Sequence, residues 1–424
     1  MQSKLIRNIA TIASSTVLTQ AAMLAVMPLL TRVYPPETFG LFAVFSSIHA
    51  IMLILSTLKY DMAIVIPADY KTSQNLLFLS SALSIVFSIA TLLCLIVIYM
   101  AKPGELSPYY FLVPISVVFA VIYSNLQQWG ARHCEYQNYA ASQIVNTAGN
   151  LLTSVAIALA LPKSVNGLII GFLVGVTAGG IYLIIVWRRR RDQSPFHDMS
   201  ITAADLKSTA RSYANMPRYV LPFTVLLVIS QNLTPVVLSH YYNLAEVGYF
   251  AVASRILLAP ASVFGGAIGE PFRAELAARL RNQLEVGTMT RKIIMTLTTA
   301  GITGFGIIFV FAPWFFPLFF GPGYQSSSLI AQAICIGALG QFIALPVTYT
   351  FIMTGHLKIG LGTMAAVAAI PSGALIIAAQ RFAMTEALFI SSTLLFATSM
   401  ILVYLAYRCA LNPNATPSVM EPQE

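Results

Sequence analysis

Long apolar segments alternate with short polar stretches along this chain, and twelve such segments can be counted. Each is about 20 residues or longer, the length that an α-helix needs to cross the hydrocarbon core of a bilayer. A helix pairs its backbone amides within the segment, as lipid requires, and the alternation typical of barrel strands is absent. The pattern therefore predicts spanning helices near 9–33, 39–60, 73–100, 109–131, 139–161, 167–187, 219–241, 246–268, 292–312, 325–352, 358–379 and 383–407.

One short stretch of the sequence occurs twice. The letters GLFAV at 40–44 return as GYFAV at 248–252, an offset of 208 residues (248 − 40). Each copy follows a long apolar segment and a polar turn that carries Glu37 or Glu246. This shared layout predicts a duplicated half-molecule. The predicted parts are an N-terminal six-helix bundle over 1–187, a flexible or short-helical linker over 188–215, a C-terminal six-helix bundle over 216–407 and a tail over 408–424 that is disordered from Asn412.

Composition supports a polytopic membrane protein. Of the 424 residues, 57% are hydrophobic and only 9% are charged, whereas soluble domains carry about 25% charged residues. This excludes a water-soluble domain of any size. The four cysteines lack metal-ligand spacing and are interpreted as free thiols, and no metal or cofactor is expected. The first apolar segment is too long for a signal-peptide core, so we expect it to be retained as a helix.

The positions of the lysines and arginines predict the orientation. With a cytoplasmic N-terminus, 19 of the 24 lie on the cytoplasmic side and 4 on the opposite side, and Arg255 lies inside a helix (19 + 4 + 1 = 24). This positive-inside bias places both termini in the cytoplasm. It also accounts for the net charge of +9 without a nucleic-acid partner. Trp129, Trp187 and Trp314 lie near segment ends and are predicted to anchor at the membrane interface.

Two ionisable residues fall well inside apolar segments, where such groups usually face a cavity or a partner. Arg255 lies about nine residues into the eighth segment, too deep to reach either surface easily. It is interpreted as a cation in a substrate cavity, with a structural ion pair or a carbonyl-capped arginine as the alternative. His49 lies midway along the second segment. It is either a proton-linked switch or a hydrogen-bonded structural histidine.

Other charged candidates lie at segment ends. Lys59 and Asp61 close the second segment at the cytoplasmic side. Two residues apart on a helix they point in different directions and need not pair with each other. They are interpreted either as gate or headgroup contacts or as side chains that reach the interface. Arg218 starts the seventh segment at the cytoplasmic mouth. Arg32 and His240 are repeat mates at the outer ends of the first and seventh segments, interpreted as contacts of an anionic substrate on exit, with chance interfacial placement as the alternative for each.

Amide side chains form a third group of candidates. Such side chains bind sugar hydroxyls, and they also form hydrogen bonds between membrane helices. The candidates selected for a cavity role are Gln128, Gln231 and Asn232.

Motifs of common enzymes are absent from the sequence. There is no glycine-rich phosphate loop of the Walker type, no HExxH and no GxSxG, and no pair of carboxylates is placed as an acid–base couple within the membrane. We therefore expect no catalytic residue and no enzymatic activity.

Three stretches carry a resemblance to a known family. They are 28–42, with the letters PLLTRVYPPETFGLF; 59–67, with KYDMAIVIP; and 320–324, with FGPGY. The first resembles the family's first hairpin, the second its basic-Tyr-acidic-x-Ala-Ile motif after the second helix, and the third its outer loop between helices 9 and 10. The chain thereby resembles the polysaccharide flippases (Wzx type) of the MOP exporter superfamily, which also contains the MATE drug exporters. The resemblance covers nearly the whole chain.

The resemblance implies a fold and a function. The fold would be MATE-like, with two pseudo-two-fold related six-helix bundles in a V around a central cavity. The substrate would be an oligosaccharide linked through diphosphate to undecaprenol, moved by alternating access from the cytoplasmic to the periplasmic leaflet of a bacterial inner membrane. The product would serve O-antigen, capsule or exopolysaccharide synthesis, with membrane lipids and polysaccharide polymerase machinery as further partners. Cationic cavity residues would offset the charge of the diphosphate, and Arg255, Arg32, Lys59 and Arg218 match that role; His49 or Asp61 would couple an ion gradient.

Two competing functions are also considered. A MATE-like exporter of cationic small molecules needs buried carboxylates, and helices 1, 7 and 8 offer none at mid-depth. A membrane-embedded glycan enzyme or polymerase would need large outer loops, and the loops here are short.

Overall fold

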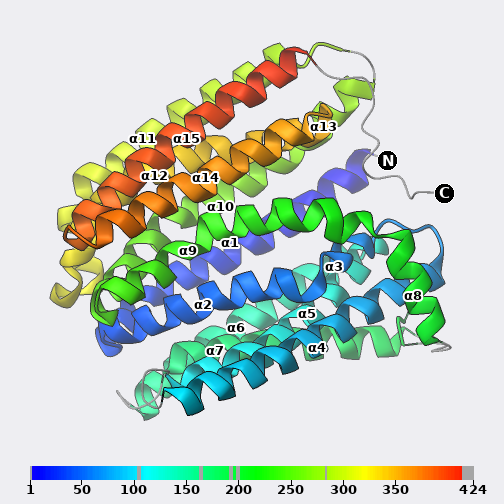
Figure 1. Ribbon diagram of the computed structural model, residues 1–424, viewed down its shortest axis with the longest axis horizontal. Helices are drawn as coiled ribbons and strands as arrows, with labels where there is room; N and C mark the ends of the chain where they lie inside the picture. The colour runs from blue at the N-terminus through cyan, green and yellow to red at the C-terminus, as the bar shows by residue number, and fades with distance from the viewer. Residues whose placement is uncertain are drawn as a thin grey trace. The chain divides into compact units, whose positions relative to one another are not determined.

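The computed structural model describes the backbone of residues 2–102, 107–161, 166–190, 194–196, 201–281 and 284–412, with the side chains of 2–10, 12, 13, 259–271, 273, 274, 277, 278, 281, 352 and 357 left out (Figure 1). Within these ranges it consists of helices and turns and contains no strand, which confirms the predicted all-α class. The tail over 413–424, for which disorder is expected, lies outside the described residues.

In the described part of the chain, twelve long helices account for the twelve apolar segments of the sequence. They are α1 (Gln2–Val33), α2 (Pro36–Thr57), α4 (Tyr70–Ala101), α5 (Leu112–Arg132), α6 (Tyr136–Ala160), α7 (Gly167–Arg189), α9 (Leu221–Tyr241), α10 (Leu244–Arg281), α11 (Gly287–Phe320), α12 (Ser326–Val347), α14 (Leu357–Ala379) and α15 (Met384–Leu411). Shorter elements lie between them, namely α3 (Tyr60–Ala63), η1 (Pro108–Phe111), α8 (Ala203–Ser212), η3 (Met216–Val220), η4 (Pro322–Tyr324) and α13 (Tyr349–Met353).

Eleven helical segments of the described chain are long and apolar enough to cross a membrane, which makes this a multi-pass membrane protein. The eighth predicted segment, 246–268, lies within α10, which is not among the eleven. This helix continues to Arg281. The stretch of mixed charges that begins at Glu270 is therefore, up to that residue, the last part of α10.

The contacts between helices divide the chain into two compact units. Of the described residues, 2–26 and 44–225 belong to unit 1, and 27–43 and 226–412 belong to unit 2. The predicted bundles 1–187 and 216–407 were defined by sequence duplication and not by contacts between helices. Their boundaries stay a prediction.

The core of unit 1 lies where α4, α5 and α7 meet. Glycines on α7 let α6 approach closely: a Cβ at Gly175 would lie 2.5 Å from the Asn146 carbonyl oxygen. Small residues of this kind are typical of helix contacts in membranes. Trp129 and Trp187 are both 0% exposed inside this core, so the prediction that they anchor at the interface is wrong. The burial of the indole rings against neighbouring helices outweighs their preference for the interface.

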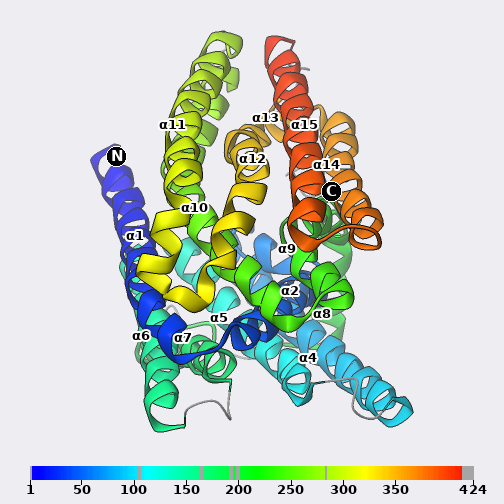
Figure 2. The same ribbon diagram turned by 90° about the vertical axis from the view of Figure 1, so that its left-hand side faces the viewer.

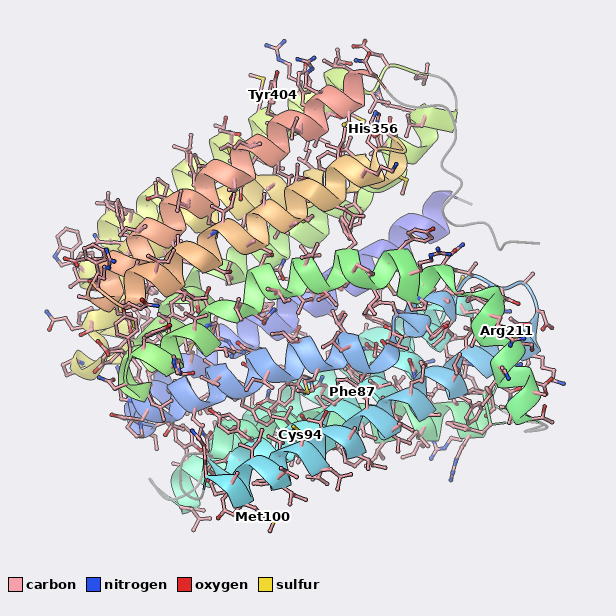
Figure 3. All side chains as sticks on the ribbon, in the orientation of Figure 1. Phe87, Cys94, Met100, Arg211, His356 and Tyr404 are labelled. Carbon is pink, nitrogen blue, oxygen red and sulfur yellow. The ribbon has the colours of Figure 1, made fainter. Side chains whose placement is uncertain are left out.

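The outer face of α4 in unit 1 is apolar and exposed. Cys94 and Met100 lie along it (Figure 3), and Met100 is 76% exposed. An exposed apolar face on a long helix is what contact with lipid requires.

Unit 2 is organised around α12, which packs against α10, α11 and α15. Figure 2 shows α12 between α11 and α15. Glycines again allow close approach, since a Cβ at Gly340 would lie 2.9 Å from the Phe396 Cα on α15.

Candidate functional site

The two copies of the repeated stretch lie against each other within unit 2. Gly40 lies in α2 and Gly248 in α10. A Cβ at Gly40 would be 2.0 Å from the Leu244 carbonyl oxygen, and a Cβ at Gly248 would be 1.9 Å from the Pro36 carbonyl oxygen. Leu244 is the repeat mate of Pro36 (36 + 208). Gly40 of the first copy therefore meets in the second copy the residue equivalent to the one that Gly248 meets in the first. This reciprocity is the signature of a two-fold relation between the copies.

Tyr324, in the stretch FGPGY, holds both copies together. Its ring makes edge contacts with Phe39 at 5.9 Å and with Tyr249 at 6.0 Å between ring centroids. Its hydroxyl donates a 2.9 Å hydrogen bond to the backbone oxygen of Tyr34. Because Tyr324 is 2% exposed, all three contacts are shielded from solvent. This side of unit 2 is the outer side in the predicted topology.

Unit 2 also contains a recess of about 90 Å³ between α9, α10, α12 and α15. The described residues that line it carry hydroxyl, amide or apolar side chains and no charge. The polar ones are Ser230, Gln231, Thr234, Ser254, Gln341, Ser391 and Ser392. The sequence prediction selected Gln231 from this set. It missed the serines because most serines in helices bond to their own backbone, as Ser230 and Ser254 also do.

The other candidates of unit 2 are not among the residues that line this recess. Arg255 follows Ser254 on α10 and is half-buried. Asn232 donates from its side chain to the Val228 carbonyl oxygen at 3.0 Å within α9. Arg32 and His240 are exposed near the last residues of α1 and α9, as expected for repeat mates at helix ends.

Lys59 and Asp61 pair with each other in unit 1. Lys59 Nζ lies 3.5 Å from an Asp61 carboxylate oxygen, and the side chains are 10% and 12% exposed. The expectation that they need not pair is wrong because it assumed one continuous helix. Instead α2 ends at Thr57, and the backbone turns through left-handed φ values of 48° at Leu58 and 64° at Lys59. Thr57 also donates its hydroxyl to the Asp61 carboxylate at 2.8 Å.

The linker packs on this corner of unit 1. Tyr60, between the paired charges, donates its hydroxyl to the Ala210 carbonyl oxygen of α8 at 3.0 Å. Gln74 of α4 donates to the Pro195 carbonyl oxygen at 2.8 Å, and Asn75 donates to the Thr209 hydroxyl at 3.3 Å. The short-helical form of the predicted linker is thus present at Ala203–Ser212 and is fixed to α3 and α4.

Arg218 belongs to the same corner. It lies in η3, a π-helical turn that contacts α3. Its side chain is exposed, and its guanidinium carbon is 5.7 Å from the centroid of the Tyr219 ring. Unit 1 therefore brings Lys59, Asp61 and Arg218 to one end, with the first two already paired.

His49 is buried in unit 1, with 6% of its surface exposed. Its Nδ1 atom is 2.8 Å from the Ser116 hydroxyl, and that hydroxyl donates its one proton to the Val113 carbonyl oxygen at 2.7 Å. Nδ1 is therefore the donor to Ser116. The ring packs against Phe45 and Phe172. This geometry fits the structural alternative, and the role as a proton switch stays a prediction.

Gln128 is half-buried on α5. The other amide side chains near it in sequence form hydrogen bonds with side chains of neighbouring helices. Asn125 donates to the Ser81 hydroxyl at 2.9 Å, and Gln127 donates to the Ser142 hydroxyl of α6 at 3.3 Å. Most amides of α5 thus follow the interhelical alternative that the sequence left open.

A family model described as "Polysaccharide biosynthesis protein" matches residues 5–270, more than half of the chain. The chain belongs to this polysaccharide biosynthesis protein family. The match confirms the family that the resemblance indicated. No curated protein matches the chain.

Among solved structures, this polysaccharide biosynthesis protein is similar to MATE transporters. One is the inward-facing conformation of a multidrug resistance MATE family transporter of the MOP superfamily, with a TM-score of 0.72 and 14% identity over 94% of this chain and 100% of that one. Another is a mutant of the Vibrio cholerae MATE transporter VcmN, with a TM-score of 0.63 and 14% identity over 99% of this chain and 98% of that one. At such identities the likeness shows the fold, which confirms the predicted MATE-like class.

Proposed function

We propose that this polysaccharide biosynthesis protein moves undecaprenyl-diphosphate-linked oligosaccharide units from the cytoplasmic to the periplasmic leaflet of a bacterial inner membrane by alternating access. The translocated unit would then reach polysaccharide polymerase machinery for O-antigen, capsule or exopolysaccharide synthesis. The observation that carries the proposal is the uncharged, hydroxyl- and amide-lined recess of unit 2, in a chain of this family.

The chemistry of the recess suits a sugar. Hydroxyl and amide groups each donate and accept hydrogen bonds, which matches the hydroxyls of a neutral glycan. A cationic drug would need carboxylates, and the described lining has none. The volume of about 90 Å³ corresponds to roughly three water molecules. The recess would therefore receive the hydroxyls of one sugar residue rather than a whole oligosaccharide.

The diphosphate needs cations at other points along the path. Lys59 is a weak candidate because Asp61 already compensates its charge at 3.5 Å. Arg218 and Arg32 are exposed, at the ends assigned to the cytoplasmic and outer sides. We place the first contact of the diphosphate at Arg218, the last at Arg32, and a contact within the membrane at Arg255. His240, Gln128 and Asn232 then serve as auxiliary polar contacts, and His49 or Asp61 would couple an ion gradient.

The first experiment is lipid analysis of cells that lack the protein. A complete lipid-linked repeat unit should accumulate in the cytoplasmic leaflet while surface polysaccharide is lost, and the sugars of that unit identify the substrate. Intact surface glycan together with altered drug sensitivity would instead support a MATE-like exporter.

Complementation by variants then tests the recess. Gln341→Leu removes an amide from the lining, and Gln332→Leu makes the same change on the same helix outside the lining. At equal protein levels, we expect the first variant to lose surface polysaccharide several-fold and the second to behave like the natural chain. Equal activities would remove the recess from the proposed path.

A further inference from the structure

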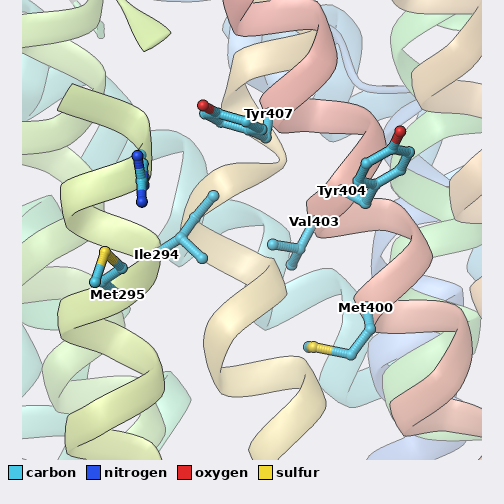
Figure 4. A pocket seen from close by; sticks show the side chains of 7 residues that line it. Ile294, Met295, Met400, Val403, Tyr404 and Tyr407 are labelled. Carbon is cyan, nitrogen blue, oxygen red and sulfur yellow. The ribbon is translucent and has the colours of Figure 1, made fainter. Parts of the chain in front are cut away.

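A second hollow in unit 2 has a different chemistry. It is a groove of about 360 Å³ between the first turns of α11 and the last turns of α15. Figure 4 shows Ile294 on α11 facing Met400 and Val403 on α15, and Met295 beside Ile294 on α11 also lines the groove. None of the described residues that line this groove also lines the neutral recess.

The groove is polar at one end and apolar at the other. Arg291 and Tyr407 lie at the end nearer the helix termini, which the charge distribution assigns to the cytoplasmic side. The Tyr407 hydroxyl points across the opening toward α11 (Figure 4). One to two helical turns further in, Met295 and Met400 leave only thioether and methylene surface.

The charge at the polar end is positive. Arg291 and its neighbour Lys292 are exposed on α11, and Arg408 is exposed on α15. Arg408 also donates at 3.0 Å to the hydroxyl of Tyr404, a residue that lines the groove. No Asp or Glu is found among the described residues that line the groove.

We infer that this groove binds an anionic phospholipid of the cytoplasmic leaflet. The phosphate accepts hydrogen bonds from the Arg291 guanidinium and the Tyr407 hydroxyl, because planar guanidinium groups match phosphate oxygens geometrically. One acyl chain lies along Ile294, Met295, Met400 and Val403. The cytoplasmic leaflet supplies such lipids, and basic residues at its surface attract them.

Both parts of the groove are needed for this assignment. Cations alone would bind any phosphate in solution, and an apolar furrow alone would accept any acyl chain. Because polar and apolar parts succeed one another along the same two helices, they match a molecule with a charged head and an aliphatic tail. This inference concerns bulk lipid and does not rest on the proposed substrate.

The test uses the full-length protein, stripped of lipid in detergent and analysed by native mass spectrometry. The probes are phosphatidylglycerol and phosphatidylcholine with identical acyl chains. We expect phosphatidylglycerol to bind at least tenfold more tightly. Arg291→Gln should remove that preference, whereas Lys292→Gln, the same charge change next to the groove, should keep it. Met295→Trp, at a residue that is 58% exposed and therefore tolerant of change, should weaken retention of both lipids.

Several results would overturn the inference. Equal binding of the two lipids would remove the anionic headgroup from the assignment. Equal loss in Arg291→Gln and Lys292→Gln would indicate general surface charge rather than a site. Competition by glycerol phosphate as strong as that by the intact lipid would show that the apolar part of the groove contributes nothing. Preferential retention of a polyprenyl diphosphate would assign the groove to the transported lipid instead.

Discussion

Adding a single methyl group at Gly40 or Gly248 should force the two repeat copies apart. In each case the new Cβ would lie 2.0 Å or 1.9 Å from a backbone carbonyl oxygen, and ordinary contact begins at 3.4 Å. The backbones must therefore separate by about 1.4 Å. Overpacking of this kind costs about 1–3 kcal/mol, which corresponds to a roughly 5- to 140-fold shift in a two-state equilibrium. If these ends separate during transport, the alanine variants should favour the separated state.

The separation can be measured directly with spin labels. Labels at Glu37 and Ala245, which are repeat mates (37 + 208), report the distance between the copies in a background without the exposed cysteines. We expect Gly40→Ala and Gly248→Ala to move the distance distribution to longer values and to reduce transport. Gly304→Ala is the matched control, because its Cβ would meet nothing within 4 Å.

The double variant sharpens this test. One displacement relieves both clashes, so the effects of Gly40→Ala and Gly248→Ala should be less than additive, as for residues that share a contact. Fully additive effects would contradict a single reciprocal contact. A distance distribution unchanged from that of Gly304→Ala would refute the reasoning altogether.

Two further predictions concern unit 1. Lys59→Met leaves the Asp61 carboxylate buried without its cation, which should cost about 3–5 kcal/mol of stability. Adding Asp61→Asn should recover part of that loss, as measured by thermal unfolding. Equal stability of the single and double variants would contradict the pairing. At the start of α8, hydrogen bonds from Thr202 hold the pKa of Asp205 below its usual range. A carboxylate whose pKa is lowered in the folded state stabilises that state at neutral pH, and the stabilisation is lost as the pH falls through the lowered pKa. Hydrogen exchange of the α8 amides, corrected for the intrinsic exchange rate, should therefore accelerate in acid in the natural chain. In Asp205→Asn the exchange rate should depend less on pH. Identical pH profiles for the two chains would refute the effect.

The apolar pattern predicts most of the fold because lipid demands long helices and leaves few alternatives. The segment expected over 167–187 is the helix Gly167–Arg189. The segment expected over 292–312 extends to Phe320, past Pro313 and Pro317, because membrane helices tolerate proline where neighbours satisfy the freed carbonyls. The break at Leu58 and Lys59 has no signal in the pattern, since neither residue is a glycine.

The candidate site is less predictable because it depends on how each helix is rotated. The sequence identifies Gln231 as a polar group in an apolar segment, and this property holds whichever way the helix faces. It cannot predict that Ser391 and Gln341 face the same recess from two other helices. The same difficulty explains Trp187, whose position near a segment end predicts an interface, whereas its neighbours bury it completely.

The reciprocal contact at Gly40 and Gly248 also bears on the ancestry of the chain. A contact in which each copy presents the same surface to the other is the kind that a symmetric homodimer makes. A single-bundle ancestor with one glycine at this position would have satisfied both sides of the contact at once. Under the duplication that the sequence predicts, fusion of two copies would have released each from identity with the other, so that the mates Arg32 and His240 could differ. Under the same prediction, both positions would have kept glycine because each faces the backbone of the opposite copy.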